Sequence, residues 1–87
     1  MYIIVVYDIG EKRVGKIYKF MKAYLPRVQN SVFEGELPAS KLAAMKAGLE
    51  ARMELDEDSV LIWVMQDSRG VDRQKVGREK LPISQFF

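Results

Sequence analysis

The first eight residues constrain the fold more than any other part of the chain. Residues 2–7 form an apolar run rich in β-branched side chains, and the run stops at a single carboxylate, Asp8. Such a run predicts a buried strand over residues 2–8. Ile9 and Gly10 follow, after which the chain is amphipathic and basic. We therefore expect Asp8 at the carboxyl end of a strand, beside a lysine-rich helix, where it could hold a metal ion near a phosphate.

Two later segments have the periodicity of amphipathic helices. Residues 12–25 place apolar side chains at helical spacing, and Pro26 ends this helix because the residue before a proline is pushed out of the α region. Pro38 precedes a second helix over residues 39–54, whose buried stripe consists of Leu42, Met45, Leu49 and Met53.

The remaining segments favour extended structure. Residues 27–37 are long for one strand, and a turn near Asn30 and Ser31 would divide them into two. Residues 59–65 predict another buried strand, residues 67–70 a turn, and residues 74–81 a weaker, charged strand that Pro82 stops. The aromatic residues expected in the core are Tyr7, Tyr24, Phe33 and Trp63.

This order of elements predicts one α+β domain over residues 1–87, a ferredoxin-like βαββαβ sandwich with two helices on one face of the sheet. The last strand is additional to that fold and leads to Phe86 and Phe87, which a monomer would bury with difficulty. We expect residues 68–87 to form a strand and tail at the interface of a homodimer. The alternative is an edge strand that closes its own sheet.

The sequence contains neither cysteine nor histidine. Their absence excludes thiolate chemistry and the commonest general base, so hydrolysis would rest on carboxylates and on a hard cation such as Mg²⁺ or Mn²⁺. A small domain without disulfides favours a cytoplasmic location. No apolar run approaches the roughly 20 residues of a membrane span, so we expect no membrane association.

Asp8 has two interpretations at this stage. An aspartate at the end of a strand often caps the following helix. If a two-fold axis passes near the end of the first strand, however, two copies of Asp8 would face each other, and a divalent cation would relieve their repulsion. Such an ion could polarise a phosphoryl oxygen and activate water.

The positive charge is distributed unevenly. The first thirty residues carry six cationic side chains against two carboxylates, and residues 69–80 carry five against two, whereas the acidic loop 54–58 lies between them. Two basic regions on a small domain favour a polyanionic partner. Lys12, Arg13, Lys16 and Lys19 could follow a phosphate backbone; alternatively they form the solvated face of an amphipathic helix.

Three segments together resemble a known family. The tripeptide Tyr7-Asp8-Ile9, the helix start at Lys12-Arg13 and the stretch RVQNSVFEG over residues 27–35 are similar to the small CRISPR-associated Cas-two family, which acts in spacer acquisition and includes endoribonucleases. The resemblance implies a symmetric homodimer with a metal-binding Asp8 near the two-fold axis, flanked by Tyr7. It further implies an Arg13 contribution to the site, phosphate contact by Arg27, hydrogen bonding by Ser31 and packing by Phe33.

The family offers two functions that differ in kind. In the first, the protein cleaves single-stranded RNA or double-stranded DNA in a Mg²⁺-dependent reaction at Asp8, and we expect Lys12, Arg13, Lys16, Lys19 and Arg27 to bind the nucleic acid. In the second, the dimer is a non-catalytic adaptor that binds duplex DNA and bridges subunits of the integrase partner Cas-one. A toxin-type messenger-RNA nuclease of the same fold is a third alternative. The sequence leaves open which of these applies, and therefore whether the protein is an enzyme.

Overall fold

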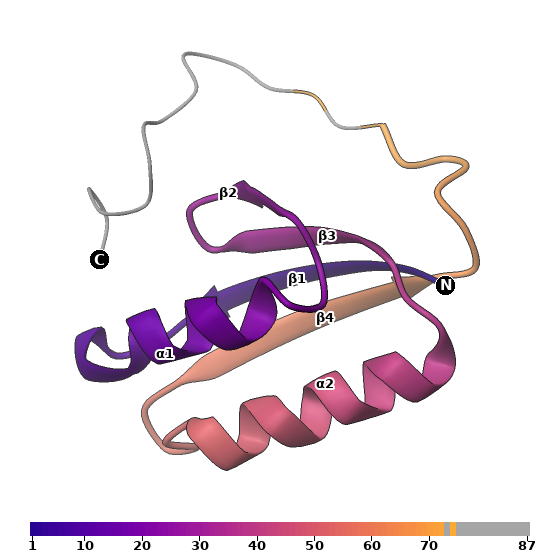
Figure 1. Cartoon of the computed structure of the whole chain (residues 1–87). Coiled ribbons are helices and arrows are strands. Elements are labelled where there is room, and N and C mark those ends of the chain that lie inside the picture. The colour runs from indigo at the N-terminus through magenta and orange to yellow at the C-terminus, as the bar shows by residue number, and fades with distance from the viewer. Residues whose placement is uncertain (73, 75–87) are drawn as a thin grey trace.

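The fold is known from a computed structural model, which describes residues 1–72 and 74. Along the chain the elements are β1 (Tyr2–Asp8), α1 (Glu11–Met21), β2 (Arg27–Gln29), β3 (Val32–Glu36), α2 (Ala39–Arg52) and β4 (Ser59–Met65), as Figure 1 shows. This βαββαβ order confirms the predicted α+β, ferredoxin-like fold. Residues 75–81 of the predicted strand 74–81 and most of the predicted interface segment 68–87 lie outside the described residues.

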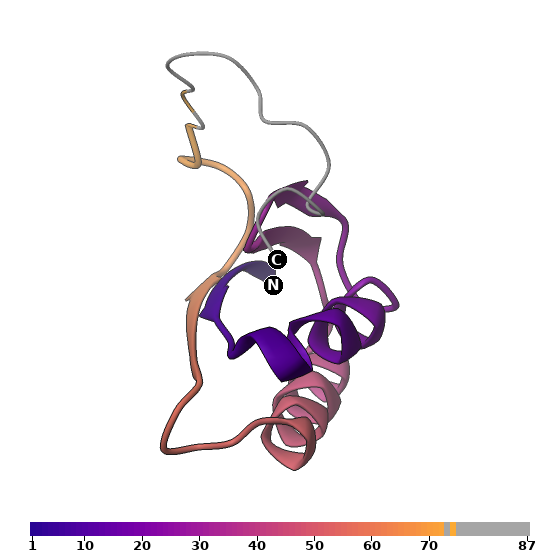
Figure 2. The same cartoon turned by 90° about the vertical axis from the view of Figure 1, so that its left-hand side faces the viewer.

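The four strands form one antiparallel sheet in the order β2-β3-β1-β4. Both helices cover the same face of this sheet, which is clearest when the molecule is turned (Figure 2). The central strand β1 pairs along its whole length with β4, from Tyr2 opposite Met65 to Asp8 opposite Ser59. Asp8 is therefore carried at the end of the best-supported strand of the sheet.

Alternation along β1 separates the two faces of the sheet. Ile3, Val5 and Tyr7 are buried beneath the helices, as expected for one face of a strand whose side chains alternate. The core is completed by residues of α1, β3 and α2 and of the loops beside them, namely Val14, Ile17, Met21, Leu25, Phe33, Leu37, Met45 and Leu49.

The opposite face of the sheet, which we call the open face, carries the alternate residues of β1, including Ile4, Val6 and Asp8. Their partners on β4 include Trp63, opposite Ile4, and Leu61, opposite Val6. These two side chains remain 49% and 59% exposed. The prediction that Trp63 belongs to the core is therefore wrong, because the register of β4 places Trp63 on the face that no helix covers.

The first helix is shorter than its periodicity predicts. It ends at Met21, and the chain continues through a looser turn in which the amides of Tyr24 and Leu25 both donate to the carbonyl of Met21. The predicted end at residue 25 is thus wrong by one turn. Leu25 is nevertheless buried, because this turn keeps it over the core while Pro26 directs the chain away from the helix axis.

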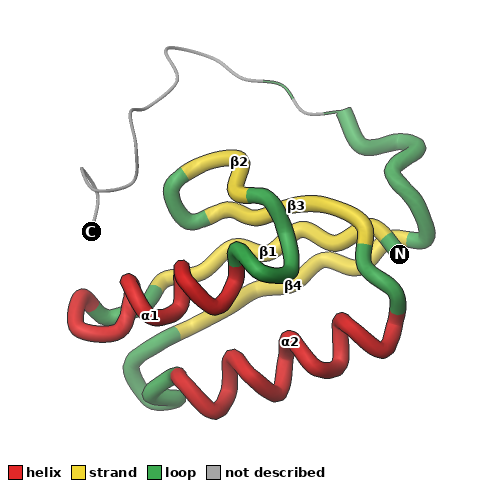
Figure 3. Tube along the Cα trace, viewed as in Figure 1, coloured by secondary structure: helices red, strands yellow, loops and turns green. Residues whose placement is uncertain are grey.

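The extended segment after Pro26 is divided, as the Asn30–Ser31 alternative predicted. β2 and β3 form a hairpin with an irregular register between Arg27 and Gln29. Figure 3 shows the loop of this hairpin at the end of the sheet where β1 leads into α1. Gly70, in the predicted turn after β4, has a φ of 86°, a left-handed conformation that favours glycine. No helix within residues 1–72 and 74 is long and apolar enough to cross a membrane.

Candidate functional site

Asp8 is the last residue of β1, and its side chain is exposed on the open face of the sheet. Within the described part of the chain, no hydrogen bond or ion pair holds its carboxylate. The interpretation of Asp8 as a helix cap is wrong, because Gly10 occupies the N-cap position of α1 and no side chain caps it. The carboxylate is therefore directed to solvent and is available to a ligand.

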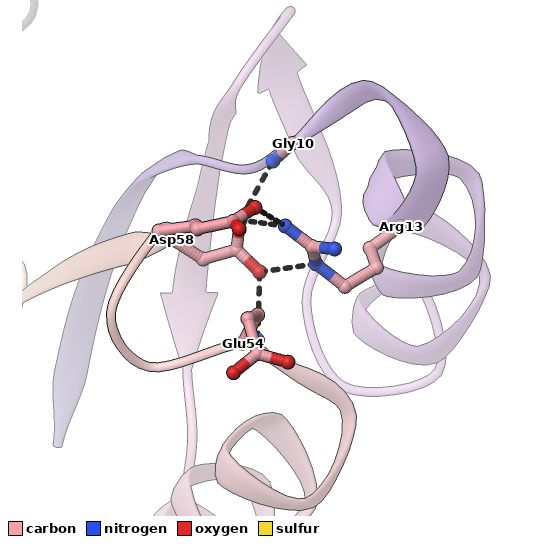
Figure 4. Close-up of polar contacts among 5 residues, drawn as sticks. Gly10, Arg13, Glu54 and Asp58 are labelled. Atoms are coloured by element: carbon pink, nitrogen blue, oxygen red, sulfur yellow. Dashed lines mark hydrogen bonds and ion pairs between the residues drawn. The ribbon is translucent and has the colours of Figure 1, made fainter.

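The loop between Asp8 and α1 is held by Asp58, which precedes β4 (Figure 4). The Gly10 amide donates to Asp58 Oδ1 at 2.7 Å, and the Glu54 amide donates to Oδ2 at 2.9 Å. Arg13 donates from Nε to Oδ2 at 2.6 Å and from Nη2 to Oδ1 at 2.8 Å. The Asp58 side chain is 0% exposed, so these four donors replace the water that a carboxylate otherwise requires.

The charge state of this pair follows from its hydrogen bonds. The Arg13 hydrogen bonds hold the pKa of Asp58 far below its usual value; burial opposes this shift, and the amides of Glu54 and Gly10 add to it. The same contact with Asp58 raises the pKa of Arg13 above its already high value. Both groups therefore stay ionised at every physiological pH.

Arg13 consequently has a different task from Asp8, because it binds other protein groups. Its guanidinium lies against Asp58 and also donates to Glu57 Oε1 at 3.0 Å. Most of its donors are used within the protein, which leaves few for a phosphate. Its role as a site residue remains a prediction, whereas its role in fixing the loop after Asp8 follows from the geometry.

Three other predicted site residues gather on the helix side of the sheet. The Tyr7 and Phe33 rings stack with centroids 5.9 Å apart, and both are buried. Arg27 pairs with Phe33 across the hairpin, and its guanidinium lies 4.7 Å from the centroid of Tyr18. Because Tyr7 and Asp8 are neighbours on one strand, their side chains point to opposite faces, so this aromatic cluster lies behind Asp8.

Burial determines the chemistry of the cluster. It raises the pKa of Tyr7 to about 12, with Arg27 opposing the shift and Tyr18 adding to it. Tyr7 is therefore a neutral phenol and a poor general base. The Nη1 atom of Arg27 is buried and has no acceptor among the described residues. The expected contact of Arg27 with phosphate stays a prediction. It would require Nη1 to become accessible to solvent.

Ser31 reaches the neighbourhood of Asp8 through its backbone. The Tyr7 amide donates to the Ser31 carbonyl at 3.1 Å, which ties the β2–β3 loop to the end of β1. The structure thus brings Ser31 close to Asp8 along the sheet. It places the side chains of Tyr7, Phe33 and Arg27 on the other side.

The lysines expected to bind nucleic acid lie on the exposed side of α1. Lys12, Lys16 and Lys19 recur at helical spacing, so they share one face of α1. None of them forms an ion pair within residues 1–72 and 74. Figure 2 shows α1 on one side of the sheet, and the alternation along β1 places Asp8 on the other side, the open face.

A resident metal ion would have Asp8 as its ligand. The exposed carboxylate has the oxygen donors that Mg²⁺ prefers, which fits the expected ion. Among the described residues, however, no three acidic, histidine or cysteine side chains lie together in a group that could hold a metal ion. One chain therefore supplies a single carboxylate, and further ligands would have to come from outside it.

Sequence reasoning missed Asp58, although it is the most extensively bonded carboxylate described here. The signal for it was weak, because Asp58 is one of four acidic residues in the segment 54–58, which looks like an ordinary solvated loop. Only the tertiary fold shows that Asp58 turns inward to Arg13 while Glu57 and Asp56 remain exposed.

Comparison with known sequences gives a family match over most of the chain. The profile described as "CRISPR associated protein Cas2" matches residues 1–71. The "CRISPR-associated endoribonuclease Cas2" of Pyrococcus furiosus is 42% identical over 87 residues, which is all of both chains. The protein of that name from Thermococcus kodakarensis is 45% identical, again over all of both chains.

Solved structures agree with the sequence comparison. A structure titled "Crystal structure of cas2" superposes with a TM-score of 0.86 at 43% identity and covers 94% of this chain and 92% of that one. Streptococcus pyogenes Cas2, solved at pH 6.5, gives a TM-score of 0.78 at 25% identity over 88% of this chain and 100% of that one.

Proposed function

Because the chain belongs to the CRISPR associated protein Cas2 family, we propose that it is a nucleic-acid-binding homodimer with a metal-dependent phosphodiesterase site at Asp8. The relatives named above are CRISPR-associated endoribonucleases, so single-stranded RNA is the first substrate to test and double-stranded DNA the second. These names favour this function over that of a toxin-type messenger-RNA nuclease.

One observation carries the proposal: the carboxylate of Asp8 is exposed, and no described residue binds it. Asp58, which contacts the start of α1, is by contrast buried and fully engaged, whereas Glu11 in the first turn of α1 is exposed. Asp8 is therefore an acidic group on a strand of the sheet that is accessible to a cation and to a phosphodiester.

A second copy of the chain would supply what one chain lacks. The open face beside Asp8 carries the exposed apolar side chains of Leu61 and Trp63, which a partner face could bury. Two Asp8 carboxylates brought together across a two-fold axis would repel each other and attract a divalent cation. When bound, Mg²⁺ would polarise a phosphoryl oxygen and lower the pKa of a bound water.

The protein's own residues would have three tasks in this reaction. Asp8 would hold the cation, and the Arg13–Asp58 pair would fix the loop that leaves Asp8. Lys12, Lys16 and Lys19 would attract the phosphate backbone, because their charges are not neutralised by any described carboxylate.

A second candidate function has its own support. The described residues contain neither a histidine nor a group of three metal ligands, and a non-catalytic adaptor needs neither. In that function the dimer would bind duplex DNA and bridge subunits of the integrase partner Cas-one during spacer integration, and Asp8 would be dispensable.

The test is cleavage of labelled single-stranded RNA and duplex DNA by wild type and Asp8→Asn, in Mg²⁺, in Mn²⁺ and in EDTA. We expect cleavage by wild type in either metal ion and its loss in EDTA and in the variant. Asp56→Asn is the matched control, because Asp56 is an exposed aspartate of the acidic loop. It should cleave like wild type.

Unchanged cleavage by Asp8→Asn would contradict the catalytic proposal. It would favour the adaptor, which predicts that Asp8→Asn still binds duplex DNA and the integrase. Circular dichroism of both variants should match wild type. This comparison distinguishes loss of folding from loss of chemistry.

A further inference from the structure

A pocket opens between the two helices, on the side of the molecule away from Asp8. It has a volume of about 640 Å³ and is lined by residues of both helices, Gly15, Lys16, Lys19, Phe20 and Arg52. Three of these five residues are cationic. The chain thus builds a concave basic surface between its two helices.

The three cations have no described carboxylate to neutralise them. Lys16, Lys19 and Arg52 form no ion pair within residues 1–72 and 74. Like charges gathered in this way repel one another, and Lys16 and Lys19, three residues apart on α1, do so at close range. An anion in the pocket would relieve that repulsion.

Arg52 is held in place for such a contact. Its guanidinium lies 4.2 Å from the centroid of the Phe20 ring, and Nη1 donates to the Gly48 carbonyl at 2.9 Å. A guanidinium has five N–H donors, and these contacts use one of them. The others are therefore oriented at the edge of the pocket with little further loss of conformational freedom.

Two glycines shape the pocket from opposite sides. A Cβ atom on Gly48 would collide with the Phe20 ring, so only glycine lets this ring lie against α2 beneath Arg52. A Cβ atom on Gly15 would meet nothing within 4 Å. Gly15 thus leaves open space next to Lys16 and Lys19. It does so in the interior of α1, where a glycine lowers helix stability.

We propose that this pocket is a phosphate-binding site, in which Lys16, Lys19 and Arg52 together bind a phosphate group. The phosphate could belong to the backbone of a nucleic-acid strand or to a free nucleotide. The spacing of Lys12, Lys16 and Lys19 favours a strand, since seven residues of helix span about 10 Å and so present charge beyond a single phosphate.

This inference extends the proposed nucleic-acid binding but is independent of catalysis at Asp8. The pocket lies in the helix layer, whereas Asp8 lies on the open face of the sheet. Binding can therefore be measured in EDTA and in the Asp8→Asn background, where cleavage is absent. Failure of one proposal would leave the other intact.

The decisive variant removes space and keeps every charge. Gly15→Leu places a side chain in the open volume. Lys19→Gln combined with Arg52→Gln removes charge from the pocket, and Lys41→Gln, an exposed lysine at the start of α2 outside the pocket, is the control for net charge. Binding is measured by anisotropy of a labelled 12-nucleotide RNA.

We expect the double variant to weaken binding by about tenfold at low salt. The slope of log affinity against log salt concentration should also fall, by an amount that corresponds to about one to two phosphate contacts. Gly15→Leu should weaken binding as well, whereas Lys41→Gln should resemble wild type. Wild-type affinity in Gly15→Leu would overturn the proposal, because binding would then reflect diffuse charge and not the pocket.

Amide spectra separate the two sources of phosphate. Inorganic phosphate, adenosine monophosphate and the RNA are each added to the ¹⁵N-labelled protein, and the amides of Gly15, Phe20 and Gly48 are followed. Saturable shifts that appear only with the RNA would support the phosphate of a nucleic-acid backbone. Shifts that appear with adenosine monophosphate at a concentration equal to or lower than that of the RNA would support a free nucleotide. No shift at these amides with any of the three would overturn the site.

Discussion

The Nε atom of Arg13 donates to Oδ2 of Asp58 at 2.6 Å and thereby joins the first turn of α1 to the loop that precedes β4. The other oxygen of the same carboxylate accepts from the amide of Gly10, two residues after Asp8. This pair consequently fixes the path of the chain as it leaves Asp8. The buried carboxylate of Asp58 thus helps to determine the position of the exposed Asp8.

Removal of Arg13 should destabilise the protein substantially. Arg13→Ala would leave the buried Asp58 carboxylate without its charged partner, which is far more costly than the loss of a surface ion pair. We expect the melting temperature to fall by about 10 °C or more in a domain of this size. Arg69→Ala is the matched control, because Arg69 pairs with Asp67 at 2.8 Å but its side chain is 91% exposed. That variant should melt within about 2 °C of wild type. Equal melting temperatures for the two variants would contradict the structural role of Arg13.

The same pair predicts a loss of stability in acid. The pKa of Asp58 is lowered in the folded state by Arg13 and by two backbone amides. Its contribution to the free energy of unfolding is therefore complete above the unfolded pKa of about 3.9 and declines as the pH falls below that value. Asp58→Asn lacks this titration. Denaturant unfolding at pH 6 and at pH 3 should show the difference in stability between wild type and Asp58→Asn shrinking in acid. A constant or growing difference would contradict this assignment.

The sequence predicted the elements well because periodicity and turn residues reflect local physics. The apolar run ending at Asp8, the helical spacing after it and the turn near Asn30 each depend on neighbours along the chain, and the structure has all three. The Arg13–Asp58 pair was not predictable in this way. Its partners are 45 residues apart, and their charges alone do not distinguish Asp58 from the three exposed carboxylates around it.

Tyr7 should prove to be a packing residue and not a base. Its side chain faces the core, opposite to Asp8, and burial raises its pKa to about 12. Tyr7→Phe removes only the hydroxyl, so any cleavage by the protein should persist within about twofold at neutral pH. A loss of activity of 100-fold or so in a folded Tyr7→Phe protein would restore the phenol as a participant in the chemistry.

Alkaline pH gives a separate measurement on the same residue. Because burial favours the neutral phenol in the folded state, the contribution of Tyr7 to stability is present below its unfolded pKa of 10 and is lost as the pH rises toward about 12. Wild type should therefore lose more stability than Tyr7→Phe between these two values in urea unfolding. Parallel curves for the two proteins would show that the phenol titrates normally.

Two glycine substitutions should have opposite effects on stability. Gly48→Ala would force the Phe20 ring from its position against α2, and the cost of such overpacking is about 1–3 kcal/mol. Gly15→Ala meets no neighbouring atom and should stabilise α1 by about 0.5–1 kcal/mol. Chemical denaturation of the two variants measures both effects. Stabilisation by Gly48→Ala would mean that Phe20 does not lie between the helices as described.

The candidate site illustrates what strand patterns leave undetermined. The composition of residues 59–65 predicts a buried strand. The strand is there, but none of its residues is fully buried, because composition does not tell which residues of an edge strand a helix will cover. Trp63 was expected in the core because it is large and apolar. It is exposed because β4 lies at the edge of the sheet and its register with β1 turns Trp63 toward the open face.

That exposure leads to the prediction on assembly. If the open face joins two copies of the chain, Trp63→Glu would place a charge in the interface and dissociate the dimer, since an unpaired charge there loses its hydration. Leu55→Glu is the matched control, because Leu55 is also highly exposed but lies in the loop before β4, where it lines a pocket with Val60 and Ile62 on the helix side of the sheet and not on the open face. Sedimentation velocity at micromolar concentration should give a dimer for wild type and Leu55→Glu and a monomer for Trp63→Glu. Because the metal site is proposed to need two Asp8 carboxylates, Trp63→Glu should also lose metal-dependent cleavage while keeping its fold. A dimeric Trp63→Glu protein would exclude the open face as the interface and would leave residues 73–87 as the segment to test next.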